Sequence, residues 1–248
     1  MNQSLAPMAA VQTRRTHTAM AITIIDTMLP QLRLMHLISP SLPVGAYSYS
    51  QGLEWAVECG WVTDKESLAE WIRDIALTNL AGLEIPVLAR LYRACEEKDA
   101  ESLAYWSDYL VASRETMELR QEEKNRARAL MALLPKLEIP VAVDERICFE
   151  SCQLTGFAHA AQHWNIPMNE TAAGYIWGWC ENITLAGVKI IPLGQTAGQQ
   201  ILAEITPMIP AIVTRGLECI DDEIGASCMA QAIASSRHET QYTRIYRS

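Results

Sequence analysis

Apolar side chains recur along this chain at the three- and four-residue intervals of amphipathic helices. Leu68, Ile72 and Ile75 form one such stripe, and others begin near residues 85, 99 and 144. Thr63 and Glu66, just before the first stripe, have the spacing of a capping box at a helix N-terminus. Prolines separate the stripes, as expected where helices begin and end. The pattern predicts successive helices packed on one core.

Residues 171–188 differ from these stripes because apolar side chains cover every face of the helix that they predict. The large ones are Tyr175, Ile176, Trp177, Trp179, Ile183 and Leu185. A helix that is apolar all round lies at the centre of a fold. No segment alternates apolar and polar residues between hairpin turns, so no strand is expected. We predict an all-α fold, a single-domain bundle of roughly eight to ten helices.

The predicted helical domain spans residues 32–248 and follows a loosely ordered leader over residues 1–31. Arg14 and Arg15 precede an apolar run at residues 19–25, but the run ends at Asp26 and no cleavage site follows. The leader therefore lacks the features of a secretory signal. We expect a cytoplasmic protein that does not associate with a membrane.

The charge balance excludes two classes of partner. Lys and Arg number 20 and Asp and Glu number 29 among 248 residues, which gives a net charge of −9. A chain this acidic lacks the basic surface by which proteins bind nucleic acids or anionic membranes. Its seven cysteines include no C-x-x-C pair, so we expect reduced thiols, consistent with the cytoplasm.

The sequence lacks a phosphate-binding loop and a complete zinc-protease motif. No Gly-Lys dipeptide occurs, so the chain has no phosphate-binding loop and should not hydrolyse nucleotides. His238 and Glu239 begin like the zinc motif H-E-x-x-H, but Tyr242 stands where the second histidine must be. We predict no catalytic residue and no bound cofactor.

Four side chains could bind a metal ion as two separate pairs. Cys148, Cys152, His159 and His163 share one stripe if they lie on a continuous helix. They extend over about 22 Å, so at most they form two i, i+4 pairs, with ligands suited to nickel or zinc. The favoured interpretation is structural, with thiols packed as small apolar groups.

Three segments are too unusual to serve only as connections, and the first covers residues 37–55. Residues 39–54 within it read S-P-x-L-P-V-G-A-Y-S-Y-S-x-G-L-E, an irregular entry to a helix. Its many hydroxyl groups suggest a binding surface, while a helix-capping loop is the alternative. The candidate binding residues are Ser39, Pro40, Pro43, Gly45, Tyr47, Ser48, Gly52 and Glu54.

The second segment covers residues 191–200 and contains G-Q-T-x-G-Q over residues 194–199. Gly194 and Gly198 lie four residues apart, as do Gln195 and Gln199. Glycines at this spacing permit close helix packing, and amides are costly to bury without hydrogen bonds. We predict a close helix contact and a defined polar contact in a tunnel or interface.

The third segment is the tail, residues 234–248, which ends in R-H-E-T-Q-Y-x-R-x-Y-R-S over residues 237–248. Arginine and tyrosine are enriched at the energetic centres of protein interfaces. We predict a tail that becomes ordered when it docks on a partner. Its candidate residues are Arg237, His238, Glu239, Tyr242, Arg244, Tyr246 and Arg247.

Together with Arg114 and Glu118 in the run R-E-T-M-E-L-R, these segments resemble the UreF family of urease accessory proteins. The resemblance extends from about Leu32 to Ser248, with Ile245-Tyr246 where Leu-Phe is commoner. It implies a non-catalytic, all-α homodimer that binds UreD (also called UreH) and recruits the GTPase UreG. That complex delivers nickel to apo-urease. The tail would dock UreD, and Glu54 with the loop before it would lie on the surface or dimer region that engages UreG.

Two alternatives remain open at this point. An arginine of the charged run near Arg114 could act as a finger in the catalytic site of UreG, or the protein could favour one state of UreG and so couple hydrolysis to nickel transfer. Coupling is preferred, because a charged run is usually a solvated helix face. A metal-dependent helical enzyme that uses Glu54 or the Cys148 to His163 stripe is the alternative of another class.

Overall fold

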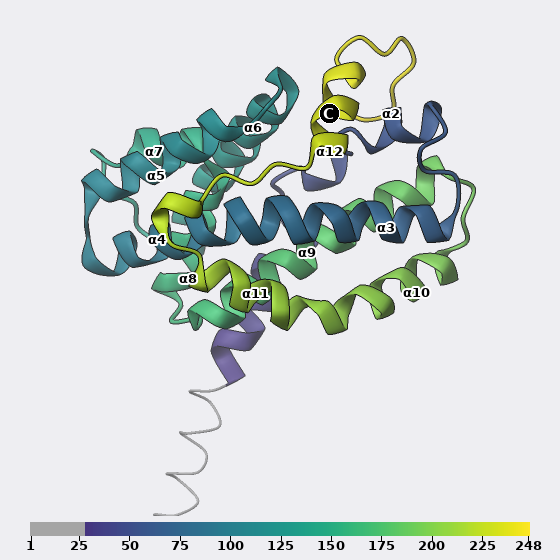
Figure 1. Cartoon of the computed structure of the whole chain (residues 1–248). Coiled ribbons are helices and arrows are strands. Elements are labelled where there is room, and N and C mark those ends of the chain that lie inside the picture. The colour runs from purple at the N-terminus through teal and green to yellow at the C-terminus, as the bar shows by residue number, and fades with distance from the viewer. Residues whose placement is uncertain (1–27) are drawn as a thin grey trace, which may run out of the picture.

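Helices make up every regular element in residues 28–248, which are the residues that the structure, a computed structural model, describes (Figure 1). The chain begins with a helix over residues 28–37, so the predicted leader lies mainly outside the described residues. The α-helices that follow are α2 (Leu53–Glu58), α3 (Lys65–Ile75), α4 (Ile85–Glu97), α5 (Ala100–Ser113), α6 (Met117–Leu133), α7 (Arg146–Ser151), α8 (Gln153–His163), α9 (Met168–Ile190), α10 (Gln195–Ile205), α11 (Ile209–Glu218) and α12 (Met229–His238). The shorter elements are η1 (Ala46–Ser48), the π-helix η2 (Ala76–Glu84), η3 (Leu134–Leu137), η4 (Thr206–Met208) and η5 (Asp221–Glu223).

The all-α prediction is confirmed. The described residues contain no strand, and α3, η2 and α4 run on as one helix over Lys65–Glu97. With that rod counted once, ten helices run from α2 to α12. The rod is apolar and long enough to cross a membrane, but 72% of its apolar window is buried by neighbouring helices. It is therefore the core helix of the bundle.

The cap of α3 differs from the predicted one by one residue. Asp64, not Thr63, is the N-cap: its carboxylate accepts from the N–H of Ser67 at 2.8 Å, and Ser67 Oγ accepts from Asp64 N–H at 3.1 Å. Asp caps a helix at least as well as Thr, and Ser67 then occupies the position expected of Glu66. The predicted helix was right and its first residue was wrong.

The π-helix η2 ends two residues before a proline and contacts a segment that is distant in the sequence. Pro86 has no N–H, so the carbonyl of Gly82, four residues earlier, has no α-helical donor. That carbonyl accepts from Gly225 N–H at 3.0 Å and Ala226 N–H at 3.4 Å instead. A Cβ at position 82 would lie 2.4 Å from Ala226 Cβ, so glycine is required for this approach. The segment between α11 and α12 is thereby held across the rod (Figure 1).

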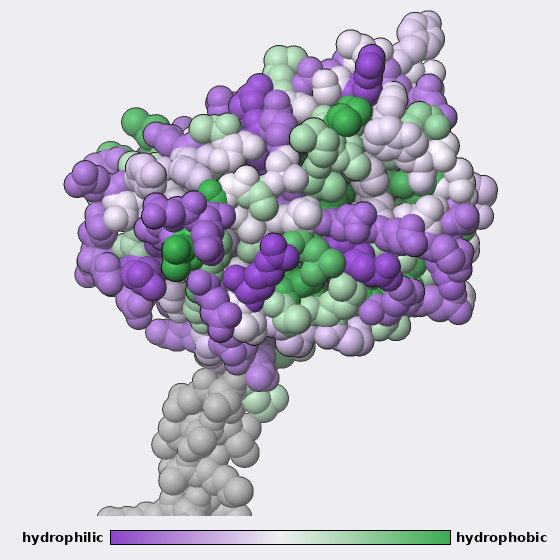
Figure 2. Space-filling view, viewed as in Figure 1, coloured by the Kyte–Doolittle hydropathy of each residue, from purple (hydrophilic) through white to green (hydrophobic). Residues whose placement is uncertain are grey.

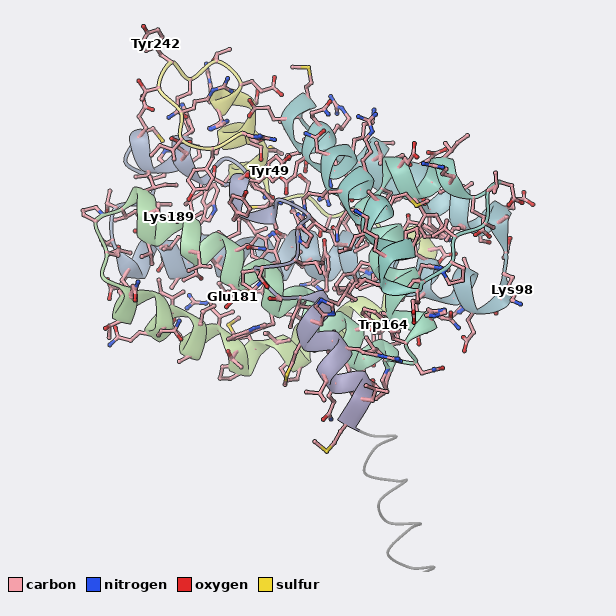
Figure 3. All side chains as sticks on the ribbon, turned by 180° about the vertical axis from the view of Figure 1, so that it is seen from behind. Tyr49, Lys98, Trp164, Glu181, Lys189 and Tyr242 are labelled. Atoms are coloured by element: carbon pink, nitrogen blue, oxygen red, sulfur yellow. The ribbon has the colours of Figure 1, made fainter. Side chains whose placement is uncertain are left out.

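The expected central helix is α9, which packs against α2, α3, α4, α8, α10 and α11. Tyr175, Ile176, Trp179 and Ile183 are buried, whereas Leu185 is exposed, so the helix is interior on most but not all of its faces. The helix over residues 28–37 packs across it with Leu34 against Gly174. Arg33 and His36 stack on Trp164, which Figure 3 shows beside that helix.

Candidate partner-binding site

The loop before α2 and the C-terminal tail form one unit, although nearly 200 residues separate them in the chain. Gly45 and Gly52 have positive φ angles of 72° and 86°, which turn the loop twice before α2 begins. A Cβ at position 52 would lie 2.6 Å from the backbone nitrogen of Ser235. Gly52 therefore lets the start of α2 rest directly on α12, from which the tail continues. We call residues 45–54 and 237–248 together the loop–tail unit.

Glu54 holds the tail on this unit. Its side chain is buried, and its two oxygens accept from the backbone N–H groups of Ile245 at 2.7 Å and Tyr246 at 2.9 Å. His238 Nε2 lies 3.3 Å from the same carboxylate. A buried carboxylate needs such donors, since burial without them is costly. Burial and the nearby Glu54 carboxylate raise the pKa of Tyr246.

His238 and Glu239 connect the tail to the start of α6. His238 is fully buried, with Nδ1 2.6 Å from Glu118 Oε2, and the other Glu118 oxygen accepts from Arg244 at 2.6 Å. Glu239 accepts from the N–H groups of Met117 at 2.8 Å and Glu118 at 3.2 Å, which are unpaired donors of the first turn. The tail thus supplies a cap for α6.

The last residues of the chain pair with the loop. Arg247 N–H donates to the carbonyl of Ser48 at 2.9 Å, and Ser50 donates through N–H and Oγ to the carbonyl of Ser248 at 2.7 and 2.6 Å. Ser248 Oγ donates to Glu122 at 2.9 Å. The tail is therefore ordered on this chain's own body, which corrects the expectation that it becomes ordered only when it docks.

The outer face of the loop–tail unit consists of aromatic, aliphatic and basic side chains. Tyr47, Tyr242 and Ile245 are exposed, and Figure 3 shows Tyr242 at the tip of the tail. The side chains of Arg237 and Arg247 are exposed as well. Apolar Met229 and Ile233 extend this face along α12, where Figure 2 shows an apolar area bordered by polar residues. The unit presents the residue types that dominate protein interfaces.

The remaining loop candidates lie at the edge of the unit. Pro40 and Pro43 are exposed, and Ser39 bonds locally to Ser41 at 2.8 Å. Their positions make the loop before Gly45 part of the accessible surface.

Arg114 does not lie on the solvated helix face that its charged run suggested. It is buried between Glu84 at 2.6 Å and Glu123 at 2.9 Å, so the interpretation as a solvated helix face is wrong at this position. Burial lowers the pKa of Arg114, but the two carboxylates outweigh this and hold it well above its ordinary value. Tyr175 lies beside this pair, and its hydroxyl donates to Glu84 at 2.5 Å. Burial raises the pKa of this hydroxyl well above its ordinary value. The Arg114 side chain is not part of the described surface.

The two G-Q pairs do not share one environment. Gly198 is buried, and a Cβ there would lie 3.0 Å from Val188 Cγ2 on α9, so close packing is confirmed at this glycine. Gly194 caps α10 with open space around its Cβ position, and the side chains of Gln195 and Gln199 are exposed. The G-Q segment lies apart from the loop–tail unit (Figure 1). Its predicted polar contact is not made within the described chain.

Replacing Gly198 with valine should therefore destabilise the fold by about 1–3 kcal/mol, because the new methyl groups overlap Val188. Gln199→Val introduces the same β-branched residue at an exposed neighbouring position and serves as the control. Urea unfolding of both variants checks the difference. Equal stability of the two would show that the close approach at Gly198 contributes nothing.

The predicted Cys and His stripe does not exist as one helix. The chain breaks between α7 and α8 at Cys152, which is extended (φ −127°, ψ 117°) and buried, and burial raises the pKa of its thiol to about 12. His159 bonds the Pro140 carbonyl at 2.7 Å, and the exposed His163 lies one turn further on. No group of three His, Cys, Asp or Glu side chains in residues 28–248 could hold a metal ion. The pairing of Cys148 with Cys152 along one helix face was wrong because the helix ends between them.

Comparison with known proteins identifies the family. A family model described as UreF matches residues 62–206. The urease accessory protein UreF of Pseudomonas putida KT2440 is 49% identical over 220 residues, 89% of this chain and 98% of its own length. The UreF proteins of Alcanivorax borkumensis SK2 and Klebsiella pneumoniae are 45% and 43% identical, over 87% and 88% of this chain. The chain therefore belongs to the UreF family, the non-catalytic accessory proteins of urease maturation.

Proposed function

We propose that this protein bridges UreD (UreH) and the GTPase UreG in the cytoplasm, as a homodimer, and couples GTP hydrolysis to nickel insertion into apo-urease. The observation that carries the proposal is the loop–tail unit. Its backbone and inward side chains are held by Glu54, Glu118 and Ser50. Its outward residues are left free for a partner, so the binding surface is formed before binding, which lowers the entropic cost of association.

The charge of this surface indicates what the partner offers. The chain as a whole carries a net charge of −9, yet Arg237, Arg244 and Arg247 lie on one short segment. Arg244 is already paired with Glu118, which leaves Arg237 and Arg247 for acidic groups of a partner. We assign UreD to this face, with Tyr242 and Ile245 as apolar anchors.

For UreG, coupling is favoured over an arginine finger. A finger must reach a phosphate, but Arg114 is enclosed by two carboxylates. Arg120 of the same run donates to the Arg114 carbonyl at 2.5 Å. Both side chains thus have structural partners, and the protein would act by binding one state of UreG more tightly than another.

The test uses cells that express the cognate urease genes with this gene intact, deleted or carrying Tyr242→Ala with Arg247→Ala. Deletion should leave urease abundant but without nickel. The double variant removes two interface residues, so its urease should approach that state. Capture of UreD by this variant should be weaker by at least about tenfold. Tyr105→Ala with Arg93→Ala changes the same residue types on α5 and α4 and should behave as wild type.

Two results would contradict the proposal separately. Fully metallated urease in the deletion strain would remove the maturation role. Normal urease with the Tyr242 and Arg247 variant, but not in the deletion strain, would remove the tail assignment alone. Circular dichroism of the purified variants checks that the helices are intact.

A further inference from the structure

The π-helix η2 packs on α3, α4, α9 and α11, and two of its residues also form hydrogen bonds with the segment that leads into α12 and with α12 itself. Asn79 is buried in η2, and its oxygen accepts from Cys228 N–H. Its amide nitrogen donates to Gln231 Oε1 at 2.6 Å. Gly82 accepts from Gly225 and Ala226. Two positions of the π-helix, three residues apart, therefore hold the backbone at Gly225, Ala226 and Cys228 and the first turn of α12.

The inward face of α12 carries three polar side chains beside the buried Ala234. Gln231, Ser235 and His238 are spaced i, i+4 and i+7, so they share one face of the helix, and all three are buried. Each bonds a different element: Gln231 bonds Asn79 of η2, Ser235 lies 2.8 Å from Thr116 Oγ1 before α6, and His238 reaches Glu54 of α2. Apolar contacts have no preferred direction, whereas buried polar groups form their hydrogen bonds in only one register of the helix.

We propose that η2 positions the partner-binding tail, with Asn79 as the positioning residue. Asn79 sets the register and rotation of α12 through Gln231, and that register decides whether His238 and the residues after it reach Glu54 and Glu118. A helix turned by one residue would rotate by about 100° and move His238 out of the pocket. Asn79 touches no partner in this proposal and acts only through α12.

The end of the π-helix provides a second contact with the crossing segment. Pro86 leaves the carbonyl of Gly82 without an α-helical donor, and that carbonyl accepts from Gly225 and Ala226 instead. Asn79 lies on the same side of η2 and extends that contact by one turn. π-helical turns are often retained at functional sites despite their poorer geometry, which fits a role in placing α12.

The inference rests on the proposed docking of UreD by the tail, and the experiment separates the two. Purified full-length protein with Asn79→Ala is compared with wild type in two measurements: binding of purified UreD, and hydrogen exchange at the amides of Ile245 and Tyr246. We expect about tenfold weaker UreD binding and at least tenfold faster exchange at these two amides. If wild type does not bind UreD, the proposed function fails, and the exchange measurement still tests the positioning role.

Two further variants separate positioning from general loss of stability. Ile205→Val removes one buried methylene-sized group from α10, away from the tail, and should lower the unfolding midpoint without changing either measurement. Gln231→Ala removes the Asn79–Gln231 bond but leaves Asn79 with Cys228 N–H, so it should reproduce part of the effects of Asn79→Ala. The effects in the double variant should be less than additive, because the shared bond is removed only once. The proposal would be overturned if Asn79→Ala showed the exchange and binding of the wild type. It would also be overturned if the effects in the double variant were additive, or if Ile205→Val changed exchange and binding as much as Asn79→Ala.

Discussion

Replacing Glu54 with alanine is expected to release the C-terminal tail while the helical core stays folded. The carboxylate accepts from the N–H groups of Ile245 and Tyr246 and faces His238, and alanine offers no acceptor for any of them. A hydrogen bond to a charged group contributes about 1.5–3 kcal/mol, so opening of the tail should become easier by at least tenfold. The cost to the core is small because the freed N–H groups can reach water.

Hydrogen exchange at the tail amides measures this release directly. Glu54→Gln should have an intermediate effect, since its one remaining oxygen can accept from one of the two N–H groups. Glu70→Ala removes an exposed carboxylate from α3 and should leave the tail unchanged. UreD binding should fall with Glu54→Ala although Glu54 is buried. Unchanged protection of Ile245 and Tyr246 in this variant would show that Glu54 does not hold the tail.

The helices could be predicted from the sequence because helix formation leaves a local signal. The stripe of Leu68, Ile72 and Ile75 and the apolar faces around Tyr175 each lie within about 20 residues, and both lie on buried faces of the rod and of α9. The π turn was missed because it depends on Pro86 together with a segment more than 130 residues away. The break at Cys152 was missed because the apolar spacing continues across it.

The loop and the tail were recognised separately from composition, but their pairing was not. Glu54 and Ile245 lie 191 positions apart, and no periodic pattern connects them. The sequence did contain one overlooked signal for the interior. Glu84 stands in an otherwise apolar run, and a charge there requires a buried partner of opposite sign. That requirement points to an arginine such as Arg114, which was instead interpreted as part of a solvated face.

Replacing Arg114 with leucine should be the most destabilising of the changes considered, by about 3–5 kcal/mol. The substitution leaves Glu84 and Glu123 buried without their shared counter-charge. Arg114→Lys should cost less but still be destabilising, because one ammonium group cannot match the two-sided geometry of the guanidinium. Arg93→Leu removes an exposed arginine from α4 and is the matched control. Urea unfolding near neutral pH provides the comparison.

The pH dependence distinguishes loss of an ion pair from simple loss of packing. In the wild type, burial raises the pKa of Glu123, but Arg114 and then Arg126 outweigh it, so the pKa is lowered below 4.5. Glu123 therefore stabilises the fold above its unfolded pKa, and this contribution is lost as the pH falls through the lowered folded value. Without Arg114 the largest opposing influence is gone, burial dominates, and the pKa of Glu123 should rise above its unfolded value. The penalty in the variant is then relieved as the pH falls, because the carboxyl becomes neutral. The difference in unfolding free energy between wild type and Arg114→Leu should accordingly shrink from neutral to acidic pH, whereas a packing defect would give a difference that does not change with pH.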